Sequence, residues 1–303
     1  MGSVRTRTRT KLRLKLIFVA LALVRTMKLE EISRSVIFGQ NEYGSNLICI
    51  ALETGLVFVE AGLNKAIAAD FRKSMEERFG RKGNMLVLTH AHLDHFFGMG
   101  AFSDIKVVAA EAGRARFERF VNADYDEKTI ESISQVFPCF RESLALGRPF
   151  KPDVWVKDRT SLGDESQKVI FEVVGGHSAC SSSIHYVPDK VMIAGDLVQV
   201  DAYPYFGEPD TSVEKWIHIL KTWESMDIDF ILPGHGRPVK RDYLHGVRTF
   251  FEEMLRVLKD LKADCVPIEE AIRHEKLPTG YWGKDAIRKP SYDMSIANLY
   301  RRL

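Results

Sequence analysis

The most informative stretch of this chain reads Thr89-His90-Ala91-His92-Leu93-Asp94-His95-Phe96-Phe97-Gly98. It places three histidines and one aspartate within six consecutive positions. An apolar run from Met85 to Leu88 precedes it, and such a run ending in a polar turn is typical of a buried strand. We therefore expect these potential metal ligands at the end of a strand.

The geometry of an extended chain groups these ligands in pairs. Side chains alternate along such a segment, so His90 and His92 point to the same side and can reach one cation. Asp94 and His95 fall in the turn beyond and can face a second cation. A solvated surface turn has no need of this density of histidine, whereas imidazole with carboxylate is the usual ligand set for zinc or iron. The stretch is therefore interpreted as part of a metal site.

Length and composition set the broad class. The chain has 303 residues, of which 45% are hydrophobic, enough for one large domain or two small ones. The cysteines show no paired spacing, which excludes a disulfide framework and a cysteine-based zinc site and predicts buried free thiols. They are Cys49, Cys139, Cys180 and Cys265.

The charge of the chain is unevenly distributed. The net charge is +2, yet residues 1–26 alone carry +7, so the remainder carries 2 − 7 = −5. An acidic main domain argues against a broad nucleic-acid surface, and nucleic acid is not an expected partner.

Residues 1–26 form a basic and apolar N-terminal extension with three interpretations. The apolar run from Leu16 to Val24 is too short to span a bilayer, which needs about twenty apolar residues. A basic stretch before a short apolar core fits a signal peptide, with cleavage after Ala22. We favour the interpretation that Met27 is the true start and that the preceding residues are upstream sequence. A cytoplasmic location follows, with export as the alternative if residues 1–22 are a signal peptide; membrane contact is expected only if the extension is retained.

The order of predicted elements indicates one domain over residues 27–303. An antiparallel meander is expected from Val36 to Gly62, followed by a helix from Leu63 to Arg81. Residues 111–150 are predicted to form a helical insertion, which either packs on the core or lines a substrate entrance. Helices are predicted again within residues 243–303.

Ligand-type residues follow three later strands. Gly176-His177 comes after a predicted strand at 168–174, Gly195-Asp196 after one at 190–194, and Gly234-His235 after one at 230–232. Each alone is a weak signal. Together with the first stretch, in this order, they resemble the metallo-β-lactamase superfamily, whose signature is His-x-His-x-Asp-His followed by Gly-His, Gly-Asp and Gly-His. The resemblance covers roughly residues 32–239.

This resemblance implies an α+β fold, a four-layer αββα sandwich of two mixed β-sheets flanked by helices. It also implies a binuclear site in which His90, His92 and His177 hold one metal, and Asp94, His95 and His235 hold the second, with Asp196 bridging them. The expected cofactors are two divalent metal ions, zinc by preference and iron or manganese as alternatives. A metal-bridging hydroxide would attack the substrate, and Asp94 would orient it and move its proton.

Comparison among branches of the superfamily narrows the expected reaction. Branches that cut RNA carry a long insertion between the elements that here hold His177 and Asp196, and lactam-cleaving members generally lack the bridging aspartate. The last motif, Pro233-Gly234-His235-Gly236, departs from the Gly-His-Glu-Tyr of glyoxalase-II-like enzymes. We therefore expect a hydrolase of a small-molecule ester, thioester or lactone. A mononuclear iron persulfide dioxygenase and a non-catalytic binding or scaffold protein are the alternatives. The oligomeric state is left open, with a homodimer as one option.

Overall fold

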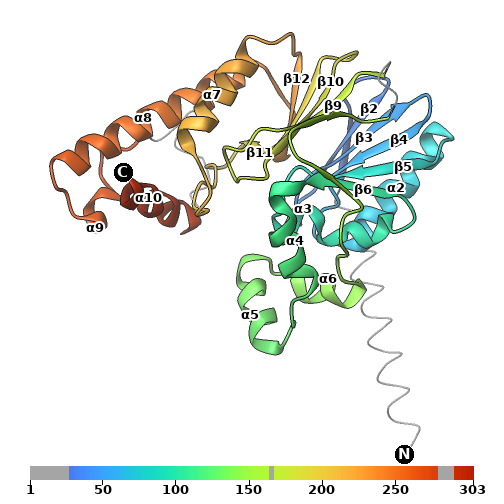
Figure 1. Ribbon diagram of the computed structural model, residues 1–303, viewed down its shortest axis with the longest axis horizontal. Helices are drawn as coiled ribbons and strands as arrows, with labels where there is room; N and C mark the ends of the chain where they lie inside the picture. Colours follow the sequence, from blue (N-terminus) through green and yellow to red (C-terminus); the bar gives the residue numbers. More distant parts are fainter. Residues whose placement is uncertain (1–26, 164–166, 279–289) are drawn as a thin grey trace, which may run out of the picture. The chain divides into compact units, whose positions relative to one another are not determined.

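The computed structural model describes residues 27–163, 167–278 and 290–303 (Figure 1). The N-terminal extension, and with it the choice among a signal peptide, upstream sequence and a start at Met27, lies outside these residues. Within them the chain divides into two compact units. The first comprises residues 27–88, 92–108 and 116–153, and the second comprises residues 89–91, 109–115 and 154–303.

The first unit carries a mixed sheet whose strands follow one another in chain order. They are β1 (Lys28–Glu31), β2 (Val36–Gln40), β3 (Leu47–Leu52), β4 (Gly55–Val59), β5 (Gly83–Val87) and β6 (Lys106–Ala110). The pairs from β1 to β4 are antiparallel, as the predicted meander requires, and β4, β5 and β6 are parallel. Strand β7 (Val154–Val156) belongs to the second unit.

Helix α2 (Lys65–Phe79) follows β4 and begins and ends at residues that suit a helix boundary. The side chain of Asn64 accepts hydrogen bonds from the backbone N–H groups of Ala66 and Ile67 at 2.8 and 3.4 Å, which satisfies donors that the first turn leaves open. Gly80 ends the helix with a φ of 59°, a left-handed conformation that favours glycine. One face, with Phe71 and Met75, is buried.

The histidine-rich turn follows β5 and forms two short helices, α3 (Leu93–Phe96) and the 3₁₀ helix η1 (Phe97–Phe102). The backbone carbonyl of Asp94 accepts a hydrogen bond from the Ser45 N–H at 3.0 Å, and that of His95 accepts one from the Ala61 N–H at 2.8 Å. The meander therefore fixes the backbone of the turn.

The segment predicted as a helical insertion is helical throughout most of its length. It contains η2 (Glu111–Gly113), α4 (Arg114–Val121), α5 (Glu127–Val136) and α6 (Phe140–Leu146). The buried Phe140 of α6 packs against Phe97 of η1, with ring centroids 5.0 Å apart. Helix α5 has no buried residue, and Val136 at its end is 71% exposed.

The second unit carries the other mixed sheet. Its strands are β8 (Arg159–Ser161), β9 (Val169–Val173), β10 (Ser182–Tyr186), β11 (Val191–Gln199), β12 (Phe230–His235) and β13 (Val239–Lys240), in the order β13-β12-β11-β10-β9-β8. Strands β11 and β12 are parallel, and the remaining pairs are antiparallel. The predicted fold class, α+β with two mixed sheets flanked by helices, is confirmed.

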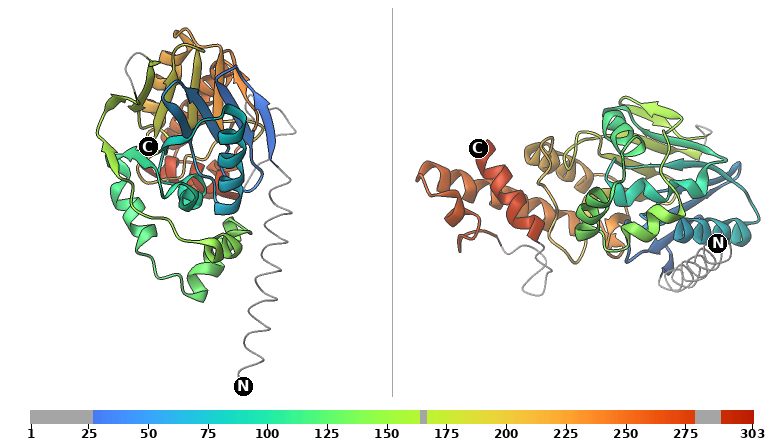
Figure 2. Two further views of the ribbon diagram at one scale, coloured as in Figure 1. Left: turned by 90° about the vertical axis from the view of Figure 1, so that its right-hand side faces the viewer. Right: turned by 90° about the horizontal axis from the view of Figure 1, so that it is seen from below.

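The described residues of the second unit include the helices α7 (Val213–Glu224), α8 (Tyr243–Ala263), α9 (Ile268–Ala271) and α10 (Pro290–Arg302). Helix α7 packs on α8, and the rings of Trp216 and Phe251 lie 4.6 Å apart between them. The right-hand view of Figure 2 shows α10 next to α8. The Tyr300 hydroxyl of α10 lies 2.6 Å from the carbonyl of Val266, which follows α8, and 3.2 Å from that of Leu261 in α8. These contacts build one apolar core around α8.

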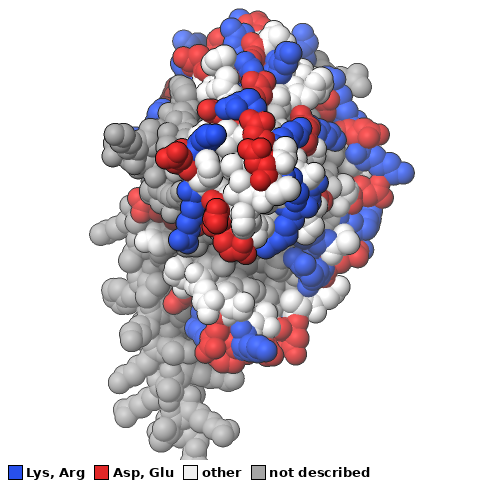
Figure 3. Space-filling view, turned by 90° about the vertical axis from the view of Figure 1, so that its left-hand side faces the viewer, with Lys and Arg blue, Asp and Glu red and all other residues white. Residues whose placement is uncertain are grey.

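The surface over the C-terminal helices carries both signs of charge. Figure 3 shows basic and acidic side chains interspersed on this face, and Arg256 pairs with Asp260 along α8 at 3.2 Å. Among the described residues, no helix has the length and apolar character needed to cross a membrane.

All the cysteines are free, as predicted. Cys49 and Cys180 are buried, which confirms the expectation of buried thiols for these two. The same expectation is wrong for Cys265, which is exposed, and Cys139 is half-buried. Cys265 follows the end of α8, where the chain turns at the surface.

Candidate metal centre

The aspartate of the Gly-Asp motif lies inside a strand. The sequence predicts a strand at 190–194 with Gly195-Asp196 just after it, but β11 continues to Gln199, and its register with β12 shifts on both sides of Gly195. Gly195 has a φ of 51°, and a Cβ atom there would lie 2.5 Å from Oγ1 of Thr89. Glycine has no Cβ atom and therefore allows this close approach. The strand bulges at Gly195, directly before Asp196. In the same way, His235 is the last residue of β12 rather than part of the turn beyond it.

Three histidines of the second unit surround the Asp196 carboxylate. Its Oδ2 lies 3.9 Å from Nε2 of His90 and 3.8 Å from Nε2 of His177. Its Oδ1 lies 3.5 Å from Nε2 of His235. His90, His177 and Asp196 are buried, whereas the side chain of His235 is 29% exposed. The two carboxylate oxygens therefore face different histidines.

These distances fit ligands that share a cation. A direct N–H···O hydrogen bond spans about 2.7–3.2 Å, and all three separations are longer. Ligands bound at about 2.0–2.2 Å to a tetrahedral ion lie roughly 3.3–3.6 Å apart, close to what is observed. The donor set of imidazole nitrogen and carboxylate oxygen suits zinc, iron or manganese. The residues present therefore fit a divalent metal.

Neighbouring groups fix the orientation of two of these rings. Nδ1 of His177 donates to the backbone carbonyl of Tyr205 at 2.9 Å, which turns Nε2 toward Asp196. Nδ1 of His90 lies 3.0 Å from Oγ1 of Thr89. Ser178, the residue after His177, bonds through its hydroxyl to Ser181. Contacts of this kind hold metal-binding imidazoles in place.

The first unit holds a second pair of ligands. Nε2 of His95 lies 3.9 Å from Oδ2 of Asp94, and Nδ1 of His95 lies 3.0 Å from Oε1 of Glu60. His95 is fully buried, Glu60 is 1% exposed and Asp94 is 7% exposed. Glu60 directly follows β4 and was not predicted. The one available signal was an acidic residue closing the apolar run from Leu56 to Val59.

Each predicted ligand can thus be assigned to one of the two units. His90, His177, Asp196 and His235 belong to the second unit. Asp94 and His95 belong to the first, together with His92, which precedes α3 and is half-buried. The grouping of all these residues around two ions stays a prediction.

A groove of about 450 Å³ in the second unit lies apart from these ligands. It runs between α7 and one face of the sheet, with Met192 and Trp223 among its apolar walls and His185 and Lys215 among its polar ones. The convergent histidines and carboxylate lie elsewhere. We place the chemistry with the ligands.

Comparisons with known proteins identify relatives of the chain. The protein named Acyl-coenzyme A thioesterase MBLAC2 in Gallus gallus is 28% identical over 195 residues, covering 58% of this chain and 67% of that protein. Its namesake in Homo sapiens is 26% identical over 174 residues, covering 54% of this chain and 60% of the human protein.

A solved structure extends the likeness to most of the chain. A metallo-beta-lactamase family protein from Thermus thermophilus superimposes with a TM-score of 0.65 at 16% identity, covering 89% of this chain and 94% of that one. At this identity the likeness shows the fold alone.

The family itself is shown by a sequence match. The family model of the metallo-beta-lactamase superfamily matches residues 44–235, more than half of the chain and most of the segment predicted to resemble it. This chain belongs to the metallo-beta-lactamase superfamily.

Proposed function

We propose that this protein is a binuclear metal-dependent hydrolase whose substrate is an acyl thioester, with esters and lactones as related substrates. The observation that carries the proposal is the Asp196 carboxylate, whose two oxygens face different histidines. Membership of the superfamily and the names of both relatives support the assignment of the chain as a metal-dependent hydrolase. The relatives' names also favour the thioester among the three substrate classes.

Two ions are proposed because the ligands separate into two sets. His90 and His177 face Oδ2 of Asp196, and His92, two residues after His90, would complete this set. His235 faces Oδ1 and would join Asp94 and His95 around the second ion. A carboxylate bridge offsets the repulsion between two dications. Zinc suits both sets, with iron and manganese as alternatives.

The bound metals would polarise the substrate carbonyl and bring the ionisation of the attacking water close to neutral pH. Asp94 would orient that water and accept its proton. Attack at the carbonyl carbon breaks the C–S bond and releases a carboxylic acid and a thiol. Glu60 holds the ring of His95, and the Tyr205 carbonyl holds that of His177, so neither ligand needs to reorient during turnover.

The experiment that tests this function combines metal content with a substrate panel. Protein purified without added chelator is analysed for metals and assayed on acyl-coenzyme A thioesters, aryl esters and lactones. We expect two zinc ions per chain and thiol release that Asp94→Ala lowers by at least about 10²-fold. Asp124→Ala, which removes an exposed acid of the helical insertion, is the matched control and should keep full activity.

Other outcomes would favour the alternatives. One iron ion per chain with oxygen uptake on a persulfide substrate would replace the hydrolase by the dioxygenase. If the chain binds no divalent metal, a non-catalytic binding or scaffold protein would be the remaining alternative. Activity on lactones or aryl esters without thioester cleavage would keep the hydrolase and remove the thioester preference.

A further inference from the structure

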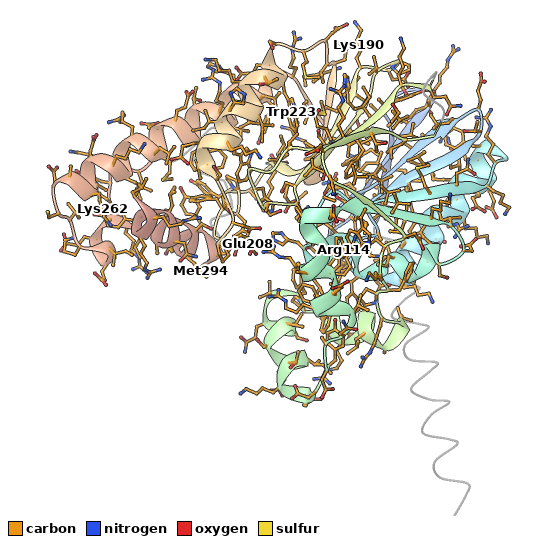
Figure 4. All side chains as sticks on the ribbon, in the orientation of Figure 1. Arg114, Lys190, Glu208, Trp223, Lys262 and Met294 are labelled. Atoms are coloured by element: carbon orange, nitrogen blue, oxygen red, sulfur yellow. The ribbon has the colours of Figure 1, made fainter. Side chains whose placement is uncertain are left out.

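The C-terminal helix α10 lies outside the segment that matches the family, yet it is bonded to the loop of residues 205–211. Three polar side chains of the helix make these bonds, namely Ser295, Asn298 and Arg302. Their spacing of three and four residues places them on one face of the helix. Figure 4 shows the loop, labelled at Glu208, beside α10, labelled at Met294. The helix therefore presents a continuous polar edge to the loop.

The bonds are made to the loop backbone. Oγ of Ser295 accepts from the Phe206 N–H at 3.2 Å, and Nδ2 of Asn298 donates to the Gly207 carbonyl at 2.9 Å. Nη1 of Arg302 lies within hydrogen-bond distance of three carbonyls. They belong to Glu208, Pro209 and Thr211, at 3.4, 3.2 and 3.0 Å.

The guanidinium gives this arrangement its strength. Three carbonyl oxygens that converge on one point repel one another, and a fixed positive charge offsets that repulsion. Helix α10 is itself held in place, because Ile296 and Leu299 are buried and the Tyr300 hydroxyl bonds to backbone carbonyls at the end of α8 and just after it. The conformation of the loop therefore depends on a well-anchored helix.

The same loop holds the metal ligand His177 from several directions. The Tyr205 carbonyl accepts from its Nδ1 at 2.9 Å, and the Thr211 hydroxyl donates to its backbone carbonyl at 2.7 Å. Asp210 accepts from the Ala179 N–H at 3.0 Å, and the Ser212 N–H donates to the Gly176 carbonyl at 2.8 Å. Both the ring and the flanking backbone of His177 are therefore set by the loop.

We propose that α10 is a positioning element for the metal centre, in which Ser295, Asn298 and Arg302 fix the 205–211 loop and the loop fixes His177. The proposal rests on the proposed function in one respect, the role of His177 as a metal ligand. In this arrangement the three helix residues act on His177 through the loop backbone, as positioning residues. Their effect is to keep Nε2 of His177 aimed at Asp196 before metal arrives.

The test replaces the loop-binding side chains and measures metal binding directly. The double variant Asn298→Ala with Arg302→Ala is compared with Arg256→Ala, which removes an exposed arginine of α8 that does not touch the loop. Cobalt(II) is titrated against a chromophoric chelator, and the visible spectrum of the cobalt-saturated protein is recorded. Denaturant unfolding of each metal-free protein reports stability separately.

We expect the double variant to bind cobalt about 10-fold or more weakly and to show an altered spectrum at saturation, since loss of a group that orients a ligand typically costs 10–100-fold in affinity. Arg302→Lys should fall between, because an ammonium keeps the charge but lacks the planar fork. A cobalt affinity and spectrum equal to those of Arg256→Ala would overturn the proposal. The proposal would also be overturned if the spectrum were unchanged and the loss in cobalt-binding free energy were no larger than the loss in unfolding free energy of the metal-free protein.

His177→Ala separates this proposal from the proposed function. If His177→Ala binds cobalt as tightly as the unaltered chain, His177 is not a ligand and the proposed metal centre fails. If His177→Ala loses cobalt while the α10 variants keep it, the metal centre stands and the positioning role of α10 is wrong.

Discussion

Glu60 has a backbone conformation that is uncommon for a residue with a side chain. Its φ is 67°, in the left-handed region, where a non-glycine residue is destabilised by about 1 kcal/mol or more. The residue is 1% exposed, and its carboxylate meets Nδ1 of His95 at 3.0 Å. The strain is therefore retained at the position where it aims a buried acid at a predicted metal ligand.

Replacing Glu60 tests that role. Glu60→Ala should weaken binding of the second metal by roughly 10–100-fold, because the His95 ring loses the acceptor that orients it. Glu60→Gln keeps an oxygen acceptor and should have a smaller effect. Metal affinity measured by chelator competition checks both variants against Glu53→Ala, an exposed acid in the β3–β4 turn. Equal affinities in all three would remove Glu60 from the site.

Sequence patterns predicted the metal ligands but not the groups that orient their side chains. His90, His92, Asp94 and His95 lie within six positions, so their density alone indicated a metal site. Glu60 reaches His95 across 35 positions of the chain. The acceptor for His177 is a backbone carbonyl, which every residue has, so no pattern of side chains can reveal it.

At the scale of elements, β11 shows how one glycine shapes a strand. The sequence predicted a strand at 190–194, with Gly195-Asp196 after its end. The chain instead bulges at Gly195 and resumes pairing as far as Gln199. The Asp196 carboxylate accepts a hydrogen bond from Nε2 of Gln199 at 3.0 Å, so the continued strand also helps to hold this predicted metal ligand.

Gly195→Ala is expected to be more destabilising than an alanine at another left-handed glycine. Gly80 has a φ of 59° with no atom within 4 Å of an added Cβ. Gly80→Ala should therefore lower the free energy of unfolding by about 1 kcal/mol, through the left-handed backbone alone. Gly195→Ala adds the collision with Thr89 and should lose about 1–3 kcal/mol more. Urea unfolding of the two variants measures the difference. Equal losses would mean that the chain relaxes around the added methyl group.

Elements with weak apolar patterns were the ones that the sequence did not predict. Strand β1 is exposed at every position and is held by its backbone pairing with β2. Strands β8 and β13 have only three and two residues. The long elements, α2 and α8 among them, were predicted because their apolar residues recur at helical spacing over many turns.

For the whole molecule, the metal centre would connect segments that are distant in sequence. In the second unit alone, its predicted ligands are residues 90, 177, 196 and 235. A cation that binds this native arrangement and not the unfolded chain stabilises folding by about 4 kcal/mol at a concentration 1,000 times its dissociation constant. The metal is therefore expected to contribute to stability as well as to chemistry.

Metal removal should lower the melting temperature. We expect EDTA to reduce the Tm by roughly 5–15 °C and added zinc to restore it, because each kcal/mol shifts the Tm of a chain of this size by about 2–4 °C. Scanning calorimetry makes the comparison, with zinc-saturated EDTA as the control for chelator effects. A Tm that does not respond to EDTA would contradict a structural contribution from the metal.

The short strand β1 bears on how copies of this protein meet. It ends the strand order of its sheet, and its exposed residues include Lys28, Glu30 and Glu31, the last paired with Arg78 of α2. Charged, short edge strands resist the addition of a strand from another molecule, and so protect a sheet from aggregation. A homodimer built by joining two such edges is therefore disfavoured, and this side of the sheet is guarded against fibril-like stacking.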